Sequence, residues 1–307
     1  MRRIVGVVIF VIGVLLIALG ALKMVPGLAP QTGIFGVLIG AVVFGLSFIK
    51  DSEPGPDAPP PLSPFERVTG TFFEPARIFE NLHWHPRWLA AFVTIAISAA
   101  IYNVAFVQRL TPEVVVLAPI EKTIEGGWIP AERAEKVKED AREAARSPIT
   151  RITGPLTEIG GIFLFMVFLA ALLFVLALIF GGRLNFWQAL CVAMYSSMPV
   201  IVIEKLLSLV LLYIKSPEDI DPVKGGRTLV KADLSILFSP TAHIYLYVIG
   251  GFFGLLTIYG LWLEATGLRR TGEKISSASA WTIALILWTI GLILALCAAA
   301  LFPTFVT

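Results

Sequence analysis

The sequence predicts an all-α protein, a polytopic transmembrane helix bundle with about seven spans. Of its 307 residues, 57% are hydrophobic and only 15% are charged, whereas soluble domains carry about 25% charged residues. The apolar residues also fall in long blocks and not at the spacing of an amphipathic helix. A helix needs roughly 20 apolar residues to cross about 30 Å of hydrocarbon, and several blocks reach that length.

Seven apolar blocks are the predicted spans. They cover residues 4–22, 33–49, 88–107, 161–180, 186–214, 244–263 and 280–302. Gly181 and Gly182 are predicted to end the fourth helix, and Asn185 is predicted to cap the fifth. The fifth block contains Pro199, which removes a backbone hydrogen bond and clashes one turn back, so we expect a kink or break there.

Residues 1–50 are predicted to form an N-terminal transmembrane hairpin with its turn at Pro26, Gly27 and Pro30. Glycines mark one face of each helix, every seven residues in the first and as a GxxxG pattern in the second. Small residues let helix backbones approach closely in lipid. The glycines predicted to pack the hairpin are Gly6, Gly13, Gly20, Gly36 and Gly40. A cleaved signal peptide is the alternative for the first block, although its apolar core usually spans only about 7–15 residues.

A proline-rich linker, residues 51–64, separates this hairpin from a five-span membrane domain at residues 65–302. The linker has no apolar periodicity, so we expect it to be extended or disordered. Two polar loops interrupt the domain, at residues 108–157 and 215–240, and a solvated helix is predicted at 130–146 in the first loop.

Residues 65–87, which open the membrane domain, are amphipathic and not apolar throughout. The pattern predicts a short helix that lies at the membrane surface, with a cap packed under the bundle as the alternative. Pro75 suits a first helical turn. The apolar side chains predicted to share one side are Phe72, Phe73, Ile78, Phe79 and Leu82.

Basic residues in short segments predict the orientation, because long loops translocate largely regardless of charge. Arg2 and Arg3 precede the first span, and Arg269, Arg270 and Lys274 lie between the sixth and seventh. With seven spans both regions share one side, which should be cytoplasmic. The N-terminus is then cytoplasmic, and the C-terminus lies outside.

One adjacent pair of opposite charges, Glu204 and Lys205, stands inside an apolar block. Ionisable residues within a membrane are candidates for function by default, so Pro199, Glu204 and Lys205 are the candidate functional residues. The structural alternative is that Glu204, which lies roughly 27 Å along the helix from Phe186, is near the far interface. There Lys205 can extend its ammonium to the headgroups.

Motifs for catalysis and for cofactor binding are not found. The sequence has no GxSxG, HExxH or GxxxxGK[ST] pattern, and no acidic or cysteine cluster completes a metal site at His83 and His85. No basic tract with interleaved aromatics indicates nucleic-acid binding. We therefore predict a protein without catalytic residues, cofactor or metal, whose partners are membrane lipids and either another protein or further copies of the chain.

Three stretches resemble the YIP domain family, the Ypt-interacting-protein type of multispanning membrane protein. GTFFEPARIFENLHWHPRWL (70–89) is similar to the N-terminal segment of prokaryotic members, GGRLNFWQALCVAMYSSMP (181–199) to the middle segment, and the stretch from Leu237 through GLRR (267–270) and the last span to the closing helices. The resemblance covers roughly residues 65–302. It implies five spans after residue 87, residence in a prokaryotic cytoplasmic (inner) membrane, and no catalytic residue. The N-terminal hairpin, the long charged loop 108–157 and the short cytoplasmic segment depart from the family pattern.

Three functions follow as hypotheses. The first is a non-enzymatic scaffold, adaptor or membrane-organising protein, which the small-residue hairpin and the polar loops favour. The second is a small-solute transporter or channel that uses a broken span at Pro199 with Glu204. The third is an intramembrane enzyme, for which the only candidate polar residues are Asn103, Tyr195, Ser196, Ser197 and His243.

Overall fold

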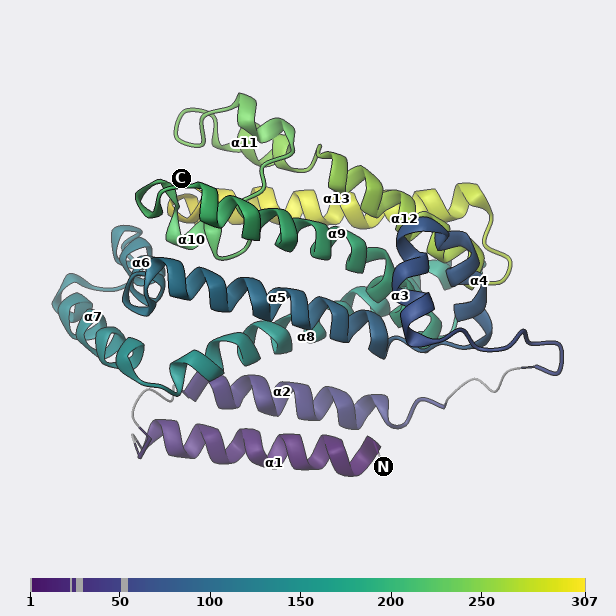
Figure 1. Cartoon of the computed structure of the whole chain (residues 1–307), viewed down its shortest axis with the longest axis horizontal. Coiled ribbons are helices and arrows are strands. Elements are labelled where there is room, and N and C mark those ends of the chain that lie inside the picture. The colour runs from purple at the N-terminus through teal and green to yellow at the C-terminus, as the bar shows by residue number, and fades with distance from the viewer. Residues whose placement is uncertain (1, 23, 26–29, 51–54, 307) are drawn as a thin grey trace. The chain divides into compact units, whose positions relative to one another are not determined.

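The computed structural model describes residues 2–22, 24–25, 30–50 and 55–306, and it is all-α (Figure 1). Within these residues five helices are long and apolar enough to cross a membrane, and α2 (Pro30–Leu46) is a shorter apolar helix. The five are α1 (Arg2–Ala21), α5 (Leu89–Leu110), α8 (Thr150–Ile179), α9 (Phe186–Ile214) and α13 (Ser277–Leu301).

Shorter helices connect the long ones. They are α3 (Pro64–Phe73), α4 (Pro75–Trp84), α6 (Pro112–Glu125), α7 (Ala131–Arg146), η1 (Pro217–Asp219), α10 (Pro222–Gly225), η2 (Leu234–Leu237), α11 (Ile244–Gly251), α12 (Leu255–Thr271) and η3 (Pro303–Phe305). The chain divides into two compact units. The first comprises residues 1–50, 99–164 and 205–230, and the second comprises residues 51–98, 165–204 and 231–307. Helices α5, α8 and α9 contribute residues to both.

In the first unit, α1 and α2 pack against each other through glycines. A Cβ added to Gly13 would lie 2.4 Å from the Val37 backbone nitrogen, and one added to Gly40 would lie 2.4 Å from that of Phe10. Such distances leave no space for a side chain. Gly6 and Gly36 also face the opposite helix, and Gly20 is buried. The turn predicted at Pro26 and Gly27 lies outside the described residues.

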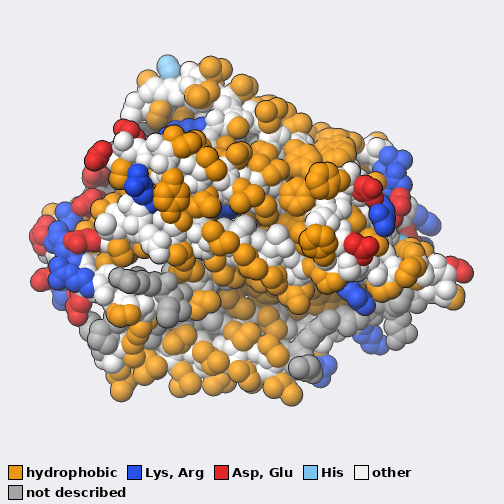
Figure 2. Space-filling view, viewed as in Figure 1, with side chains coloured by type: hydrophobic (Ala, Val, Ile, Leu, Met, Phe, Trp, Pro, Cys, Tyr) orange, Lys and Arg blue, Asp and Glu red, His pale blue; other side chains and the backbone are white. Residues whose placement is uncertain are grey.

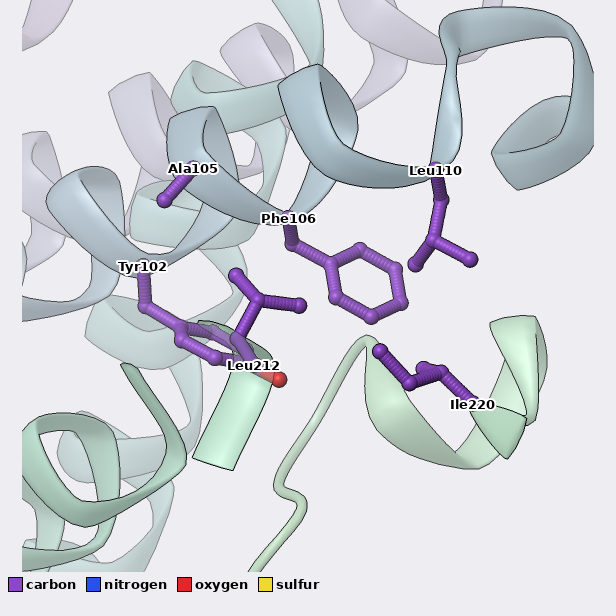
Figure 3. Close-up of a cluster of buried hydrophobic side chains, with 6 residues drawn as sticks. All are labelled: Tyr102, Ala105, Phe106, Leu110, Leu212 and Ile220. Atoms are coloured by element: carbon purple, nitrogen blue, oxygen red, sulfur yellow. The ribbon is translucent and has the colours of Figure 1, made fainter. Parts of the chain in front are cut away.

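The first unit also has a hydrophobic core where the end of α5 meets the segments that follow α9. The side chains in this cluster are Tyr102, Ala105, Phe106, Leu110, Leu212 and Ile220. Figure 3 shows the Phe106 ring directed toward Leu110 and Ile220, and the Tyr102 ring beside Leu212. Gly225 closes the cluster, since a Cβ there would lie 3.0 Å from the Phe106 ring.

Most of the predicted polar loop 108–157 is helical. Helix α6 begins at Pro112 and packs against α7, and α7 is the helix that the sequence predicted at 130–146. Helix α8 begins at Thr150 and not at Gly161. On α7 the buried face consists of Ala134, Ala141 and Ala145, while Lys, Arg, Asp and Glu side chains cover the α6–α7 hairpin (Figure 2). Small residues on one face let a highly charged helix pack closely.

In the second unit the amphipathic segment forms two helices, because Glu74 ends α3 and Pro75 starts α4. Helix α4 packs against α12 and buries Ile78, Phe79 and Leu82. The cap alternative therefore describes α4 within this unit. The prediction that Phe73 shares this buried side is wrong. Phe73 precedes the break between α3 and α4, and it is 85% exposed.

The described part of the linker lies against α4. The Asn81 amide donates to the Pro60 carbonyl at 3.0 Å and accepts from the Leu62 N–H at 3.3 Å. His85 Nε2 is 2.7 Å from the Pro59 carbonyl oxygen. These bonds hold proline-rich backbone that has no helix or sheet to satisfy it.

Helix ends in the second unit follow the sequence signals. Gly181 has a φ of 76°, and the Gly182 N–H donates to the Ala177 carbonyl at 2.9 Å, so the predicted stop after α8 is confirmed. The Asn185 side chain accepts from the Gln188 N–H at 2.8 Å, and the Gln188 side chain accepts from the Asn185 N–H at 2.9 Å. This reciprocal pair is a capping box, and it confirms Asn185 as the cap of α9.

The chain is interrupted in a different helix from the one predicted. Helix α9 runs without a break from Phe186 to Ile214 through Pro199, so of the expected kink or break the break is wrong. The predicted span 244–263 is instead divided, because α11 ends at Gly251 and α12 begins at Leu255. Helix η2 packs closely against the end of α11, because a Cβ on Gly250 would lie 2.7 Å from the Ser235 backbone nitrogen.

Candidate functional site

The ammonium of Lys205 lies in a polar cluster within the first unit. Lys205 is only 9% exposed, and its Nζ is 3.4 Å from Glu158 Oε1 and donates to the Arg227 carbonyl at 2.9 Å. The other carboxylate oxygen of Glu158 accepts from the Asn103 amide at 3.0 Å. A charge this buried needs both an opposite charge and hydrogen bonds, and Lys205 has both. We call Asn103, Glu158 and Lys205 the Lys205 cluster.

The Tyr102 ring completes the surroundings of the ammonium. Lys205 Nζ lies 4.8 Å from the ring centroid, which is within reach of a cation–π interaction. The Tyr102 hydroxyl donates to the Gly225 carbonyl at 2.5 Å. The aromatic ring therefore joins the charged cluster to the hydrophobic core of Figure 3.

A second set of hydrogen bonds fixes the segment that supplies the Arg227 carbonyl. The hydroxyls of Ser208 and Thr228 are 3.0 Å apart, and the Ser208 hydroxyl also accepts from the Leu229 N–H at 3.0 Å. Ser208 lies one turn after Lys205 on α9, so both side chains face the same segment. The loop after α10 is thus held against α9 at two successive turns.

Lys205 and Glu204 have different surroundings although they are adjacent. Successive residues of a helix do not face each other, and the ion-pair partner of Lys205 is Glu158. The Lys205 ammonium is bonded to Glu158 and to the Arg227 carbonyl inside the first unit. Glu204 is half-buried, and Pro199 is buried inside the continuous helix α9.

A second polar junction, in the second unit, joins α4, α9 and α12. His83 Nδ1 is 2.7 Å from the Thr271 carbonyl oxygen, and Gln188 Nε2 donates to the His83 carbonyl at 2.8 Å. The Thr271 hydroxyl donates to the Phe79 carbonyl at 3.2 Å, and Arg270 forms an ion pair with Glu80. The bonds to the Thr271 and His83 carbonyls thus satisfy backbone groups in the last turns of α12 and α4.

Arg67 anchors α3 to the segment that precedes α5. Its side chain is 3% exposed and donates to the carbonyls of Arg87, at 3.1 Å, and Ser63, at 3.4 Å. The Tyr195 hydroxyl donates to the same Arg87 carbonyl at 3.2 Å. Close packing accompanies these bonds, because a Cβ on Gly267 would lie 2.9 Å from the Phe79 ring.

The polar residues considered for catalysis serve separate structural bonds. Asn103 binds Glu158, Tyr195 binds the Arg87 carbonyl, and Ser196 donates to the Ala193 carbonyl at 3.3 Å. His243 lies at the N-cap of α11. Among the residues that the structure describes, no group of three or more His, Cys, Asp or Glu side chains could hold a metal ion. Chemically, these clusters fix helices in place.

Sequence reasoning missed two acidic residues. Glu158 was assigned to a polar loop, but α8 begins eight residues earlier and carries it into the Lys205 cluster. Glu264 directly follows the predicted span 244–263, but it belongs to α12 and lines a groove. The available signal in each case was a lone acid at the end of an apolar block, within one or two turns of the predicted span.

Three features define the class of this protein as a multi-pass α-helical membrane protein. It has long apolar helices, hydrophobic side chains exposed along them (Figure 2), and polar clusters whose groups bond one another. A comparison with protein families narrows this class to one family. The model of the Yip1 domain matches residues 69–298, and the chain belongs to the Yip1 domain family. This confirms the resemblance found in the sequence. Proteins of this family are generally non-enzymatic membrane trafficking proteins. No curated protein and no solved structure gives a significant match.

The family match overlaps all three stretches that carried the resemblance, and the structure shows what they do together. Residues of the first stretch form α4, residues of the second begin α9, and the GLRR sequence closes α12. Their polar side chains and backbone groups make the junction around His83 and Gln188. The family pattern therefore falls on a structural junction within the second unit.

Proposed function

We propose that the chain is a non-enzymatic membrane scaffold or adaptor that presents α3 as a binding surface for a protein partner or a second copy of the chain. One observation carries the proposal. Phe65 and Phe73 on α3 are 76% and 85% exposed. They lie eight residues apart and so face the same side of the helix.

The surface around these aromatic side chains is rigidly supported. Arg67 and Thr71, on the other side of α3, are buried. A shallow pocket beside Phe73 is lined by Glu66, Glu74 and Arg77 among others. Aromatic side chains with charged residues at the edge are typical of protein interfaces, and a fixed helix loses little entropy on binding.

A crosslinking experiment tests the proposal. A photoreactive phenylalanine analogue at position 73, in full-length protein within native membranes, should give one discrete crosslinked species. The Phe65→Ala, Phe73→Ala double variant should reduce copurification of that partner by about tenfold in mild detergent, the loss that truncating a strong interface residue causes. Phe168→Ala is the matched control, because Phe168 is 59% exposed on a membrane-spanning helix. Unchanged copurification by the double variant would reject the proposal.

Transport is the rival function, and its structural premise has changed. It required a broken helix at Pro199, but α9 is continuous and the interruption lies between α11 and α12. Glu204 remains half-buried in α9. A Glu204→Gln variant with altered flux of a small solute in proteoliposomes would favour transport over the adaptor function.

The orientation and the number of spans are part of the same proposal. We infer seven spans with the N-terminus in the cytoplasm of a prokaryotic cell, which places α3 and α4 on the cytoplasmic side. Short basic segments support this orientation. Cysteine labelling from each side of the membrane, at exposed positions in α3 and in α7, tests it, since the two helices should label from opposite sides.

A further inference from the structure

An open groove of about 370 Å³ runs along α12 in the second unit. Its lining comes from α8, α9, α12 and α13, and three of these helices are long and apolar enough to cross a membrane. Side chains such as Leu169, Ile201 and Leu287 make most of its surface apolar. A groove of this size between membrane helices can take one lipid chain.

Missing side chains create the groove. Gly260 on α12 and Gly291 on α13 both line it. A Cβ on Gly260 would meet only Val200, at 3.4 Å, and one on Gly291 would meet only the Phe252 ring, at 3.5 Å and beyond. These are ordinary contact distances, unlike those in the α1–α2 hairpin. The space beyond each glycine is therefore unfilled.

One carboxyl group lies at the charged end of this groove. Glu264 shares a face of α12 with Leu261 and Thr257, at helical spacing. It lies seven residues before Thr271, or about 10 Å along the helix axis from that end. Arg270 is near that end but is paired with Glu80. The carboxyl therefore stands between an apolar groove and a charged helix end.

The Glu264 carboxyl has a buried oxygen that nothing satisfies. Oε1 is inaccessible to solvent and has no hydrogen-bond partner among the described residues. Leaving a carboxylate oxygen desolvated without a donor is costly, and buried polar atoms in folded proteins are nearly always bonded. An isolated acceptor at the end of an apolar groove points to a ligand that brings both a donor and an apolar chain.

We propose that this groove binds a membrane phospholipid whose headgroup carries a primary ammonium. The ammonium donates to Glu264, and an acyl chain follows the apolar lining past Gly260 toward Phe252. A primary ammonium fits because it is cationic and has three N–H donors, whereas an ionised carboxylate only accepts. The apolar lining favours a lipid over a free amine in water.

The lipid site does not rest on the proposed adaptor surface, because α3 contributes nothing to the groove. The two can fail separately, since lipid binding is measured on the isolated chain without a protein partner. The probe is a set of phosphatidylcholine nanodiscs with full-length protein, containing either phosphatidylethanolamine or phosphatidylglycerol. Native mass spectrometry after transfer to detergent measures the lipid retained.

The wild-type chain should retain phosphatidylethanolamine over phosphatidylglycerol and phosphatidylcholine. Glu264→Gln keeps the shape of the side chain but removes its charge, so retention should fall about tenfold, the usual effect of losing a charge-assisted hydrogen bond. Glu273→Gln is the matched control, because Glu273 is exposed and does not line the groove. It should retain the lipid as the wild type does.

A second variant tests the acyl-chain half of the site. Gly260→Leu projects a side chain into the space beyond Val200 and should reduce retention of all three lipids. Equal retention by Glu264→Gln and the wild type would overturn the proposal. Equal retention of phosphatidylethanolamine and phosphatidylglycerol by the wild-type chain would also overturn it, and that comparison needs no variant.

Discussion

Two half-buried glutamates in this protein differ in what surrounds them. In the first unit, both carboxylate oxygens of Glu158 have partners, Lys205 and Asn103. In the second unit, Oε1 of Glu264 has none among the described residues. The difference teaches that an acid in an apolar helix serves structure when the chain itself supplies the donor. It becomes a candidate binding site when the chain supplies only the apolar walls.

The glycines of the two regions differ in the same way. Between α1 and α2 the space left by each glycine is filled by the backbone of the other helix, at 2.4 Å from the position of an added Cβ on Gly13. Along the groove the space left by Gly260 and Gly291 is not filled. Small residues alone do not distinguish the two, because both let another group approach closely.

The largest effect is expected at the Lys205 cluster. Lys205→Met leaves the half-buried Glu158 without its cation, and it should lower the free energy of unfolding by about 3 kcal/mol. Denaturation of the full chain in mixed micelles measures it. The Lys205→Met, Glu158→Leu double variant should recover most of that loss, because it removes both charges. A double variant as unstable as the single one would contradict the view that the pair is balanced within the chain.

A smaller loss is expected in the glycine hairpin. Gly13→Ala places a methyl group against the Val37 backbone and should cost about 1–3 kcal/mol, the usual effect of overpacking. Gly291→Ala, at the unfilled groove, should change stability by less than about 0.5 kcal/mol. Thermal unfolding of both variants in the same detergent makes the comparison. Equal losses would show that the groove is filled.

Glu264 should tolerate neutralisation when no lipid is bound. Glu264→Gln should change stability by less than about 0.5 kcal/mol or increase it, because it removes a carboxyl group that has no partner for one oxygen. Unfolding of delipidated protein tests this, with Glu158→Gln as the comparison. A loss at Glu264 as large as that at Glu158 would mean that the second carboxyl also has a structural partner.

The smallest effect on stability is expected at Glu66, an exposed carboxylate that serves as a baseline for Glu158 and Glu264. Hydrogen bonds from the Ser63 backbone and side chain hold the pKa of Glu66 below its usual range. Because the folded-state pKa is lowered, its stabilisation of the α3 N-terminus is present above the unfolded pKa. It is lost as the pH falls through the folded one. Amide exchange in α3 should therefore accelerate slightly in acid, and Glu66→Ala should abolish that pH dependence.

Much of the fold followed from local signals. The apolar blocks located the long helices, Gly181 and Asn185 marked a helix end and a helix start, and the alanine-rich charged run predicted α7. Such signals act within a few residues, through backbone conformation and capping. The failures were at positions decided by distant segments. Pro199 did not break α9, and α11 ends at Gly251, where η2 packs closely against it.

The candidate site was half predictable for the same reason. An ionisable residue in an apolar block marked Lys205, but its partners Glu158 and Asn103 are 47 and 102 residues away along the chain. Glu158 was hidden because the start of α8 was placed too late. Glu264 could not be identified from the sequence, because the neighbouring residues do not show that its carboxyl oxygen lacks a hydrogen-bond donor.

By itself the sequence determined that this chain enters a membrane as helices, because long apolar segments must leave water and satisfy their own backbone groups. It also determined the family, through stretches that resemble the family pattern. Only the tertiary structure decided which charges are paired and which glycines border open space. Both depend on segments brought together from far apart, and the hydropathy of a single segment carries no information about what packs against it.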